Sequence, residues 1–216
     1  MGTNGKLIGV VGFMGSGKDT VADMLIDRGF VKDSFARTLK DSVSVLFGWD
    51  RNLLDGTTSE SRAWREIPDP YWSKETDNPN FTPRLALQLF GTEAIRDTFA
   101  QDFWVSTVVK RWLDNGKPNT IITDCRFPNE INAIKRNGGL VIHVHRGEYP
   151  DWYPLVSRIN RKTHNDSDTI KFQTLLLNKE LPHISEYAWA GQDFDLELDN
   201  NGTLDDLRNK INNIRF

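Results

Sequence analysis

The stretch KLIGVVGFMGSGKDT, residues 6–20, decides the fold of this 216-residue chain. Residues 6–11 form a short, partly β-branched apolar run, which predicts a buried strand. Apolar side chains at helical spacing and a glycine stop predict a helix over 17–28. Between them, Gly12 to Lys18 matches G-x-x-x-x-G-K. The order of strand, glycine-rich loop and helix predicts a P-loop, whose backbone N–H groups hold phosphate oxygens.

Strands and helices are expected to alternate along the rest of the chain. Strands separated by helices imply right-handed crossovers and a parallel sheet covered on both faces. We therefore expect an α/β protein, with one domain over 1–216 built as a three-layer sandwich around a parallel, mostly five-stranded sheet. The further strands are expected at 31–35, 120–124, 140–145 and 194–198, and the further helices at 36–47, 83–99, 101–113, 129–137 and 203–214.

Two long stretches interrupt this alternation. Residues 48–82 are rich in Trp, Asp, Pro and charge, and residues 147–191 carry His, Asn and Asp around a possible helix at 169–179. Segments of this length in a compact domain are usually lids or binding segments. We place the substrate-binding elements there.

Composition excludes several classes of protein. With 27 Lys and Arg against 30 Asp and Glu, the net charge is −3, which argues against a general nucleic-acid binder. The single cysteine, Cys125, allows neither an internal disulfide nor a Cys-rich zinc site, and fits a reducing compartment. We find no signal peptide and no apolar run near the ~20 residues that span a bilayer. A cytoplasmic protein that binds neither nucleic acid nor membrane is expected.

The glycine-rich loop contains the candidate nucleotide contacts. Lys18 is the mobile cation for the β- and γ-phosphates, although a purely structural glycine turn is the alternative. Asp19 stands where Ser or Thr normally binds Mg²⁺, so its carboxylate either holds the metal, directly or through water, or only caps the helix. Thr20 is placed to bond the α-phosphate. The remaining loop candidates are Gly12, Gly15, Ser16 and Gly17.

Arg84, Gln88 and Arg96 lie on the expected helix 83–99, roughly on one face. Arginine binds phosphate through a planar, permanently charged fork, and a side-chain amide can read a base edge. An ordinary solvated helix face is the alternative.

Asp124 and Arg126 follow an apolar strand and lie at its carboxyl end, where ligands bind in open α/β sheets. Asp124 is a candidate to orient Mg²⁺ waters or to accept a hydrogen bond from an acceptor, and Arg126 to bind phosphate. An internal ion pair between the two is the alternative. Cys125 is expected to be a packed small residue.

Aromatic and basic side chains supply further candidates. Indole faces can stack on a base, although tryptophans are more often found in a core, and basic side chains can reach an acceptor phosphate or remain solvated. These candidates are Trp64, Trp72 and Trp104, with Arg37, Lys40 and Arg65.

In and beside the second long stretch, Arg146, Arg158 and Arg161 are candidates to close over the transferring phosphate and exclude water. His143 and His145 share one face of a strand. No further Cys or carboxylate is suitably spaced, so zinc is not expected.

Four segments resemble the deoxynucleoside monophosphate kinases of tailed bacteriophages, and the resemblance runs from about residue 6 to 214. It implies a nucleoside-monophosphate-kinase-like P-loop fold with acceptor-binding and lid insertions, ATP as donor and Mg²⁺. It also implies a deoxynucleoside monophosphate (dNMP) acceptor, a diphosphate product for DNA precursor synthesis, and a homodimer in the host cytoplasm. The segments are GFMGSGKDT (12–20), TPRLALQLFGTEAIRDTFAQDFW (82–104), IITDCRFPNEINAIKRNGGLVIHVHRG (121–147) and HISE (183–186).

The resemblance also bears on single residues. It implies catalytic roles for Lys18, Asp124 and Arg126, and a turn at Gly202 whose backbone faces the adenine, although a plain strand-to-helix turn before Thr203 is the alternative. His183 and Glu186 match the short motif and are expected to position the lid.

The rival functions are a kinase of another small molecule, such as dephospho-coenzyme A, and a nucleotide-dependent switch. The chain contains no N-K-x-D or T-K-x-D pattern of guanine specificity.

Overall fold

The computed structural model describes residues 5–215. The chain divides into two compact units, one formed by the residues up to Ser34 and from Arg111 onward, the other by Phe35–Lys110. The 48–82 segment lies within the second unit, and the 147–191 segment lies within the first.

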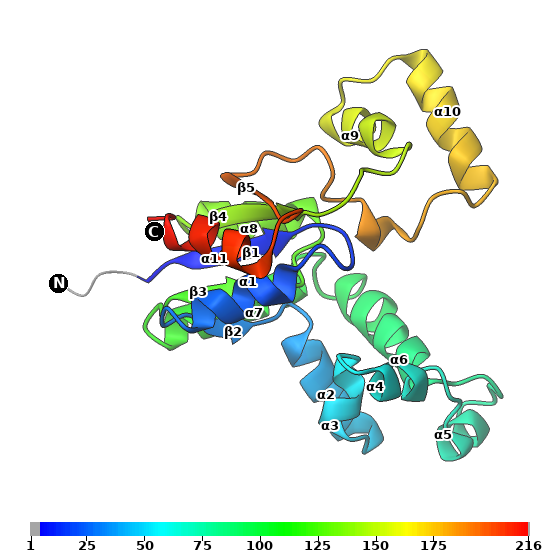
Figure 1. Ribbon diagram of the computed structural model, residues 1–216. Helices are drawn as coiled ribbons and strands as arrows, with labels where there is room; N and C mark the ends of the chain where they lie inside the picture. The colour runs from blue at the N-terminus through cyan, green and yellow to red at the C-terminus, as the bar shows by residue number, and fades with distance from the viewer. Residues whose placement is uncertain (1–4, 216) are drawn as a thin grey trace. The chain divides into compact units, whose positions relative to one another are not determined.

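The first unit is built on a five-stranded sheet (Figure 1). The strand order is β2-β3-β1-β4-β5, and every neighbouring pair is parallel. The predicted parallel five-stranded sheet is therefore confirmed, and each strand falls within or beside its expected range. The strands are β1 (Leu7–Val11), β2 (Val31–Asp33), β3 (Thr120–Ile122), β4 (Leu140–His145) and β5 (Leu196–Asp199).

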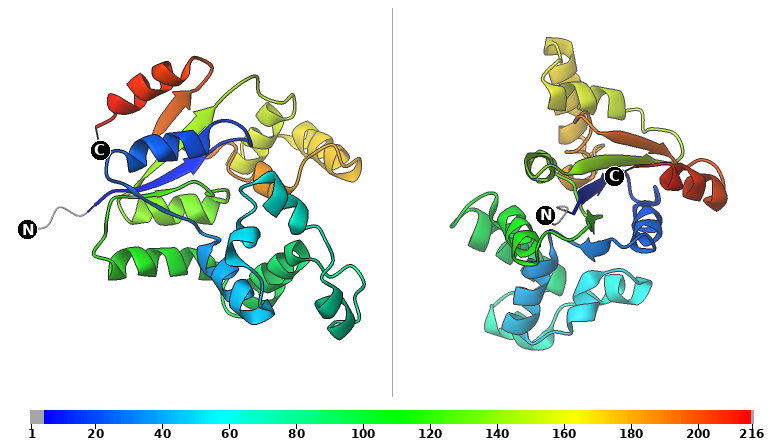
Figure 2. Two further views of the ribbon diagram at one scale, coloured as in Figure 1. Left: turned by 60° about the horizontal axis from the view of Figure 1, so that its bottom comes forward. Right: turned by 90° about the vertical axis from the view of Figure 1, so that its left-hand side faces the viewer.

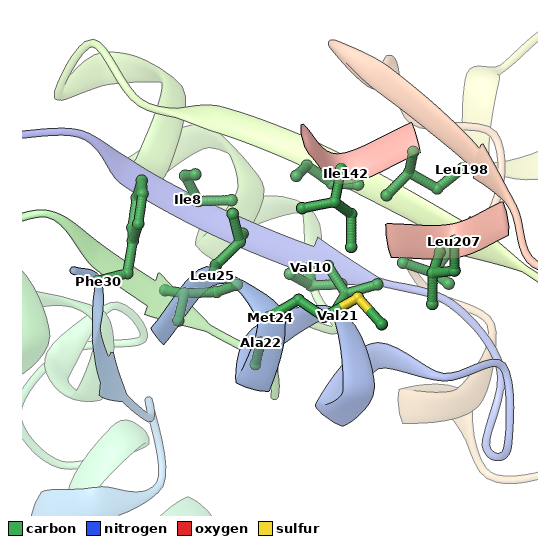
Figure 3. Packing of buried hydrophobic residues seen from close by; sticks show 13 residues of the cluster. Ile8, Val10, Val21, Ala22, Met24, Leu25, Phe30, Ile142, Leu198 and Leu207 are labelled. Carbon is green, nitrogen blue, oxygen red and sulfur yellow. The ribbon is translucent and has the colours of Figure 1, made fainter. Parts of the chain in front are cut away.

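Helices cover both faces of this sheet (Figure 2). On one face, α1 (Lys18–Ile26) and α11 (Leu204–Asn212) bury apolar side chains against the strands. Figure 3 shows this core, in which Ile8 and Ile142 of the sheet meet Leu25 and Leu207 of the helices.

On the other face, α8 (Pro128–Arg136) packs closely on β1. A Cβ atom added at Gly9 would lie 2.3 Å from the Cδ1 of Ile134, so the side chains of α8 come close to the backbone of β1 there. The three-layer arrangement brings the carboxyl ends of the parallel strands to one edge of the sheet.

Residues 147–191 fold as α9 (Tyr153–Arg161), α10 (Asp166–Leu177) and a 3₁₀ turn, Ile184–Glu186. The possible helix at 169–179 is confirmed with a shifted start, since α10 begins at Asp166 after the N-cap Asn165. Helix α9 was not expected from the sequence.

The second unit is helical and has its own apolar core. Its helices are α2 (Arg37–Phe47), α3 (Arg51–Asp55), α4 (Ser59–Trp64), α5 (Pro70–Glu75) and α6 (Pro83–Leu89), followed by a π-helix, Phe90–Arg96, and the first part of α7 (Phe103–Asp114). Val43, Trp49, Leu54 and Phe81 form the centre of the core, and Trp64 and Trp72 pack against it.

The expected single helix over 83–99 is wrong in one respect. The α-helix ends at Leu89 and continues as a π-helix with a wider turn. The 100° step per residue that placed Arg96 on the face of Arg84 and Gln88 therefore does not hold beyond Leu89.

Within residues 5–215, no helix combines the length and the apolar character that a membrane crossing requires.

Candidate active site

The glycine-rich loop connects β1 to α1, as predicted. Gly12, Gly15 and Gly17 have φ values of 144°, 81° and 100°, in the region that favours glycine. At Gly12 a Cβ would also lie 2.3 Å from the carbonyl oxygen of Val144. The backbone therefore takes a path that side chains at these positions would prevent.

Lys18 begins α1, and its ammonium lies against its own loop. The Nζ atom donates to the carbonyl oxygens of Gly12, at 2.8 Å, and Phe13, at 2.7 Å. Burial lowers the pKa of Lys18, and the neighbouring charge of Arg126 lowers it further. A cation is thus held in the loop with a second cation nearby.

Asp19 lies in the first turn of α1 and not at its N-cap, which is Gly17. The alternative that Asp19 only caps the helix is therefore wrong. Its Oδ1 accepts hydrogen bonds from Lys32 Nζ, at 2.8 Å, and Thr123 Oγ1, at 3.3 Å. Burial alone would raise the pKa of Asp19, but the bond and charge of Lys32 outweigh it, so the pKa is lowered. The carboxylate is ionised, and 77% of its side chain is exposed.

Asp124 and Arg126 follow β3 at the carboxyl edge of the sheet. Asp124 Oδ2 accepts a hydrogen bond from Ser34 Oγ at 2.7 Å. The guanidinium of Arg126 forms its ion pair with Glu186 and also donates to Ser185 Oγ at 3.3 Å. The alternative of an ion pair between Asp124 and Arg126 is therefore wrong. Arg126 links the sheet edge to the HISE motif.

Glu130 is a site residue that the sequence analysis missed. Its side chain is buried, and Oε2 accepts from the backbone N–H groups of Arg126, at 2.7 Å, and Phe127, at 3.0 Å. These bonds fix the backbone that carries Arg126. Glu130 lies three residues after the N-cap Phe127, the position of the Glu in a capping box, but Phe127 lacks the side-chain oxygen of that motif, so the sequence carries only half of the signal.

Cys125 is buried, as predicted for a packed residue, and burial raises the pKa of its thiol. A protonated thiol is a poor nucleophile.

Gly202 lies just before Thr203, the N-cap of α11, so the predicted turn and helix start are confirmed. The same turn contains a residue that the sequence analysis passed over. Asn200 is 8% exposed, and its Nδ2 donates to the carbonyl oxygen of Ser16 at 2.9 Å.

Two lid candidates have structural partners. Arg158 of α9 forms a two-point ion pair with Asp168 of α10, through Nε at 2.9 Å and Nη2 at 2.8 Å. Arg161 Nε donates to the carbonyl oxygen of Gly191 at 2.6 Å. Both guanidinium groups are therefore engaged in contacts within the first unit. Arg146, after β4, is exposed.

The 147–191 segment, the candidate lid, also contacts the loop through aromatic rings. The ring centroid of Phe13 lies 4.9 Å from that of Trp189 and 5.7 Å from that of Tyr153. His143 also packs on Trp189, at 5.0 Å, and is 1% exposed. Neither His143 ring nitrogen has a hydrogen-bond partner within the described residues. His143 therefore belongs to an aromatic cluster that also contains Phe13, Tyr153 and Trp189.

His183 contacts Ser185 within its own motif, Nδ1 to Oγ at 2.9 Å. His183 thereby shapes the turn that presents Ser185 and Glu186 to Arg126.

In the second unit, Arg65 and Arg84 lie together. The N–H of Arg84 donates to the carbonyl of Arg65 at 3.0 Å, and the Arg84 side chain pairs with Glu66. Burial lowers the pKa of Arg65, and the charge of Arg84 lowers it further. Two guanidinium groups and the carboxylate of Glu66 therefore lie near one another here. Gln88 is exposed on the same helix.

The other candidates of this unit are held in structural contacts. Lys40 Nζ lies 3.1 Å from Asp55 Oδ1, and Arg37 Nε lies 4.0 Å from Asp41 Oδ2. Trp104 is 4% exposed, and its indole N–H donates to the carbonyl of Gly91 at 2.8 Å. This burial indicates a core role for Trp104 and speaks against stacking on a base.

A glycine-rich loop between β1 and α1 that holds a lysine, with Asp19 in the first turn of α1 and Asp124 after β3, is the arrangement of a P-loop nucleotide-binding protein. The sequence model of the family described as "Deoxynucleotide monophosphate kinase" matches residues 58–152. A putative deoxynucleotide monophosphate kinase of Acanthamoeba polyphaga mimivirus is 35% identical, over 65% of this chain and 74% of its own length. The chain belongs to the deoxynucleotide monophosphate kinase family.

A second relative covers nearly the whole chain. The deoxynucleotide monophosphate kinase of Enterobacteria phage T4 is 28% identical, over 96% of this chain and 98% of its own length. Among solved structures, a dephospho-CoA kinase from Campylobacter jejuni aligns with 97% of this chain and 95% of its own, at a TM-score of 0.42 and 14% identity. The family assignment depends on the sequence matches. As a kinase of this family, the protein requires a nucleotide phosphoryl donor.

Proposed function

We propose that the chain transfers the γ-phosphoryl group of ATP to a dNMP, giving ADP and a deoxynucleoside diphosphate for DNA precursor synthesis. The observation that carries this proposal is the glycine-rich loop between β1 and α1, with the Lys18 ammonium held in it by the carbonyls of Gly12 and Phe13, in a chain of the deoxynucleotide monophosphate kinase family. Transfer between two phosphate chains depends on positioning and on neutralising charge, and Lys18 in the loop with Arg126 at the sheet edge would meet that need. No covalent enzyme intermediate is required.

The donor would lie on the P-loop. Backbone N–H groups of Gly15, Ser16 and Gly17 would hold its phosphate oxygens, and the N-terminus of α1 adds positive potential. Lys18 would exchange its bonds to the loop carbonyls for bonds to the β- and γ-phosphates. Gly12 would allow the backbone path of the loop. Thr20 would bond the α-phosphate, and Arg146 and the backbone of Gly202 would contact the base.

Asp19 and Asp124 fit a magnesium site that is completed by phosphates. Mg²⁺ is usually held by one or two carboxylates, several waters and substrate phosphates. The ionised, exposed carboxylate of Asp19 is an oxygen ligand of this kind. Asp124 follows β3, the strand that pairs with β1. When bound, the ion would neutralise charge on the phosphates.

The acceptor phosphate would bind to Arg65 and Arg84, whose adjacent guanidinium groups favour an anion between them. Gln88 would read the base. Arg37 and Lys40 are weaker candidates because they are held by the carboxylates of Asp41 and Asp55. Arg96 is weaker because it lies in the π-helix, outside the helix face that carries Arg84.

His183 and Glu186 would set Arg126 beside the transferring group, while the aromatic cluster of the lid excludes water. By resemblance to the family, we also propose that the protein is a homodimer, which light scattering of the purified protein would test.

The decisive assay incubates the protein with ATP, Mg²⁺ and each of the four dNMPs, and resolves the products by ion-exchange chromatography. We expect a diphosphate from at least one dNMP. Dephospho-coenzyme A, the acceptor of the rival function, serves as the control acceptor. Phosphorylation of the control acceptor with no diphosphate from any dNMP would contradict the proposal.

A further inference from the structure

Asn200 lies in the turn between β5 and α11, far in sequence from the P-loop that it contacts. We propose that Asn200 is a positioning residue, which sets the orientation of the Ser16–Gly17 peptide so that the Gly17 N–H is presented to the donor phosphates. This inference rests on the proposed function of the P-loop.

The contact between Asn200 and the loop is short and buried. Nδ2 donates to the carbonyl oxygen of Ser16 at 2.9 Å, and the Asn200 side chain is nearly inaccessible. A Cβ atom added at Gly17 would lie 2.4 Å from the same Nδ2. Asn200 therefore packs directly against the peptide that it bonds.

The turn that carries Asn200 is itself fixed at several points. The Asn200 N–H donates to the carbonyl of His145 at 2.7 Å, and Asn201 Oδ1 accepts from the N–H of Gly147 at 2.7 Å. Lys210 Nζ of α11 donates to the carbonyl of Asp199 at 2.5 Å. Because the end of β4, the residue Gly147 after it and α11 all hold the turn, the amide of Asn200 is a rigid point of attachment for the loop.

The hydrogen bond from Asn200 to the Ser16 carbonyl fixes the orientation of two groups, this C=O and the N–H of Gly17. A trans peptide is planar, and its C=O and N–H point in opposite directions. When Asn200 holds the Ser16 oxygen, the Gly17 N–H must point away from Asn200. Glycine at position 17, with φ of 100°, would otherwise allow this peptide to rotate at little cost.

Without the bond, the loop would spend part of its time with the peptide turned. Only the fraction of molecules whose loop presents the Gly17 N–H can bind the nucleotide. The apparent dissociation constant for ATP is the intrinsic constant divided by that fraction. Loss of one buried hydrogen bond of this kind corresponds to a change of about tenfold in such an equilibrium.

The test compares Asn200→Ala and Asn200→Asp with the matched control Asn137→Ala. Asn137 makes the same kind of bond, Nδ2 to the carbonyl of Ala133 at 2.8 Å, at the end of α8. Asn200→Asp keeps the shape but replaces the donor with an oxygen that repels the carbonyl. Calorimetric titration with ATP and Mg²⁺ gives the Kd, steady-state assays give KM for ATP and dNMP, and hydrogen–deuterium exchange without nucleotide reports on residues 12–20.

Both Asn200 variants should raise the Kd and KM for ATP about tenfold, with KM for dNMP within about twofold of wild type. Exchange should accelerate in residues 12–20 only, and Asn137→Ala should change none of these quantities. A folded Asn200→Ala protein with wild-type ATP affinity would overturn the inference. So would unfolding, or loss of protection throughout the sheet, because Asn200 would then be a general structural residue.

The two proposals fail in different ways. If the wild-type protein phosphorylates no dNMP, the proposed function fails. The exchange measurement needs no nucleotide and still decides whether Asn200 orders the loop.

Discussion

We expect transfer to depend most on Lys18, because its ammonium lies in the loop and the charge of Arg126 acts on it. Its bonds are to carbonyl oxygens of its own loop and not to the apolar core. Its side chain therefore contributes charge at the site and little to packing.

We predict that Lys18→Ala lowers kcat by about 100-fold or more, because it removes an electrostatic contact made in the transition state. The melting temperature should stay near that of wild type. Lys171→Ala, at an exposed position of α10, is the control and should leave both quantities unchanged. A folded Lys18→Ala protein with near wild-type kcat would contradict the P-loop assignment.

His143 is a buried residue whose protonation should affect stability. Burial, with the charges of His145 and Lys18, lowers its pKa to about 4, against an ordinary 6.5. Between these values the unfolded chain binds the proton and the folded chain does not. The contribution to stability is complete above pH 6.5 and falls as the pH drops toward 4, by up to about 3 kcal/mol.

Urea unfolding at pH 7.5 and pH 5 measures this dependence. We expect the free energy of unfolding to fall less between these pH values in His143→Gln than in wild type. The exposed His164→Gln should behave like wild type. Equal pH dependence in all three proteins would show that His143 does not titrate as described.

At the scale of elements, the first turn of α1 combines the helix N-terminus with the carboxylate of Asp19. Lys32 of β2 and Thr123 after β3 hold this carboxylate from the neighbouring strands. An acidic side chain here is favoured by the helix dipole and remains open to a cation.

We predict that Asp19→Asn raises the Mg²⁺ concentration needed for half-maximal activity, because an amide is a weaker partner for a hard dication. Asp19→Ser should recover part of the activity by restoring a hydroxyl ligand. The lost ion pair with Lys32 is exposed and should cost less than about 1 kcal/mol of stability. An unchanged magnesium requirement in Asp19→Asn would remove the metal role and leave the kinase assignment intact.

The sequence predicted the sheet and the long helices because their signals are local and repeat over several turns. It missed α3, α4 and α5, although Asp50, Thr58 and Asp69 are N-caps, because helices of five or six residues show too little periodicity. The π-helix after Leu89 has no simple sequence signal. The bond from Asn200 to Ser16 joins residues 184 positions apart, and no single-sequence pattern predicts such a contact.

At the scale of the whole molecule, the donor and acceptor candidates belong to different units. The P-loop, Asp124 and Arg126 are in the first unit, whereas Arg65 and Arg84 are in the second. Changes in the second unit should therefore affect one substrate and spare the other.

We predict that Arg84→Lys raises KM for dNMP several-fold and leaves KM for ATP unchanged. Lysine keeps the charge but loses the planar fork that binds phosphate at two points. Arg136→Lys, on the exposed side of α8, is the control. A change in KM for ATP instead would show that Arg84 serves the donor.

The most direct test of the central claim follows the phosphoryl group itself. Wild-type protein is incubated with Mg²⁺, dNMP and ATP labelled at the γ-phosphate, and the labelled products are separated. The claim predicts that the label moves into the deoxynucleoside diphosphate, with one ADP formed for each diphosphate. Label found only as inorganic phosphate, or fixed on the protein, would contradict direct transfer between two bound nucleotides.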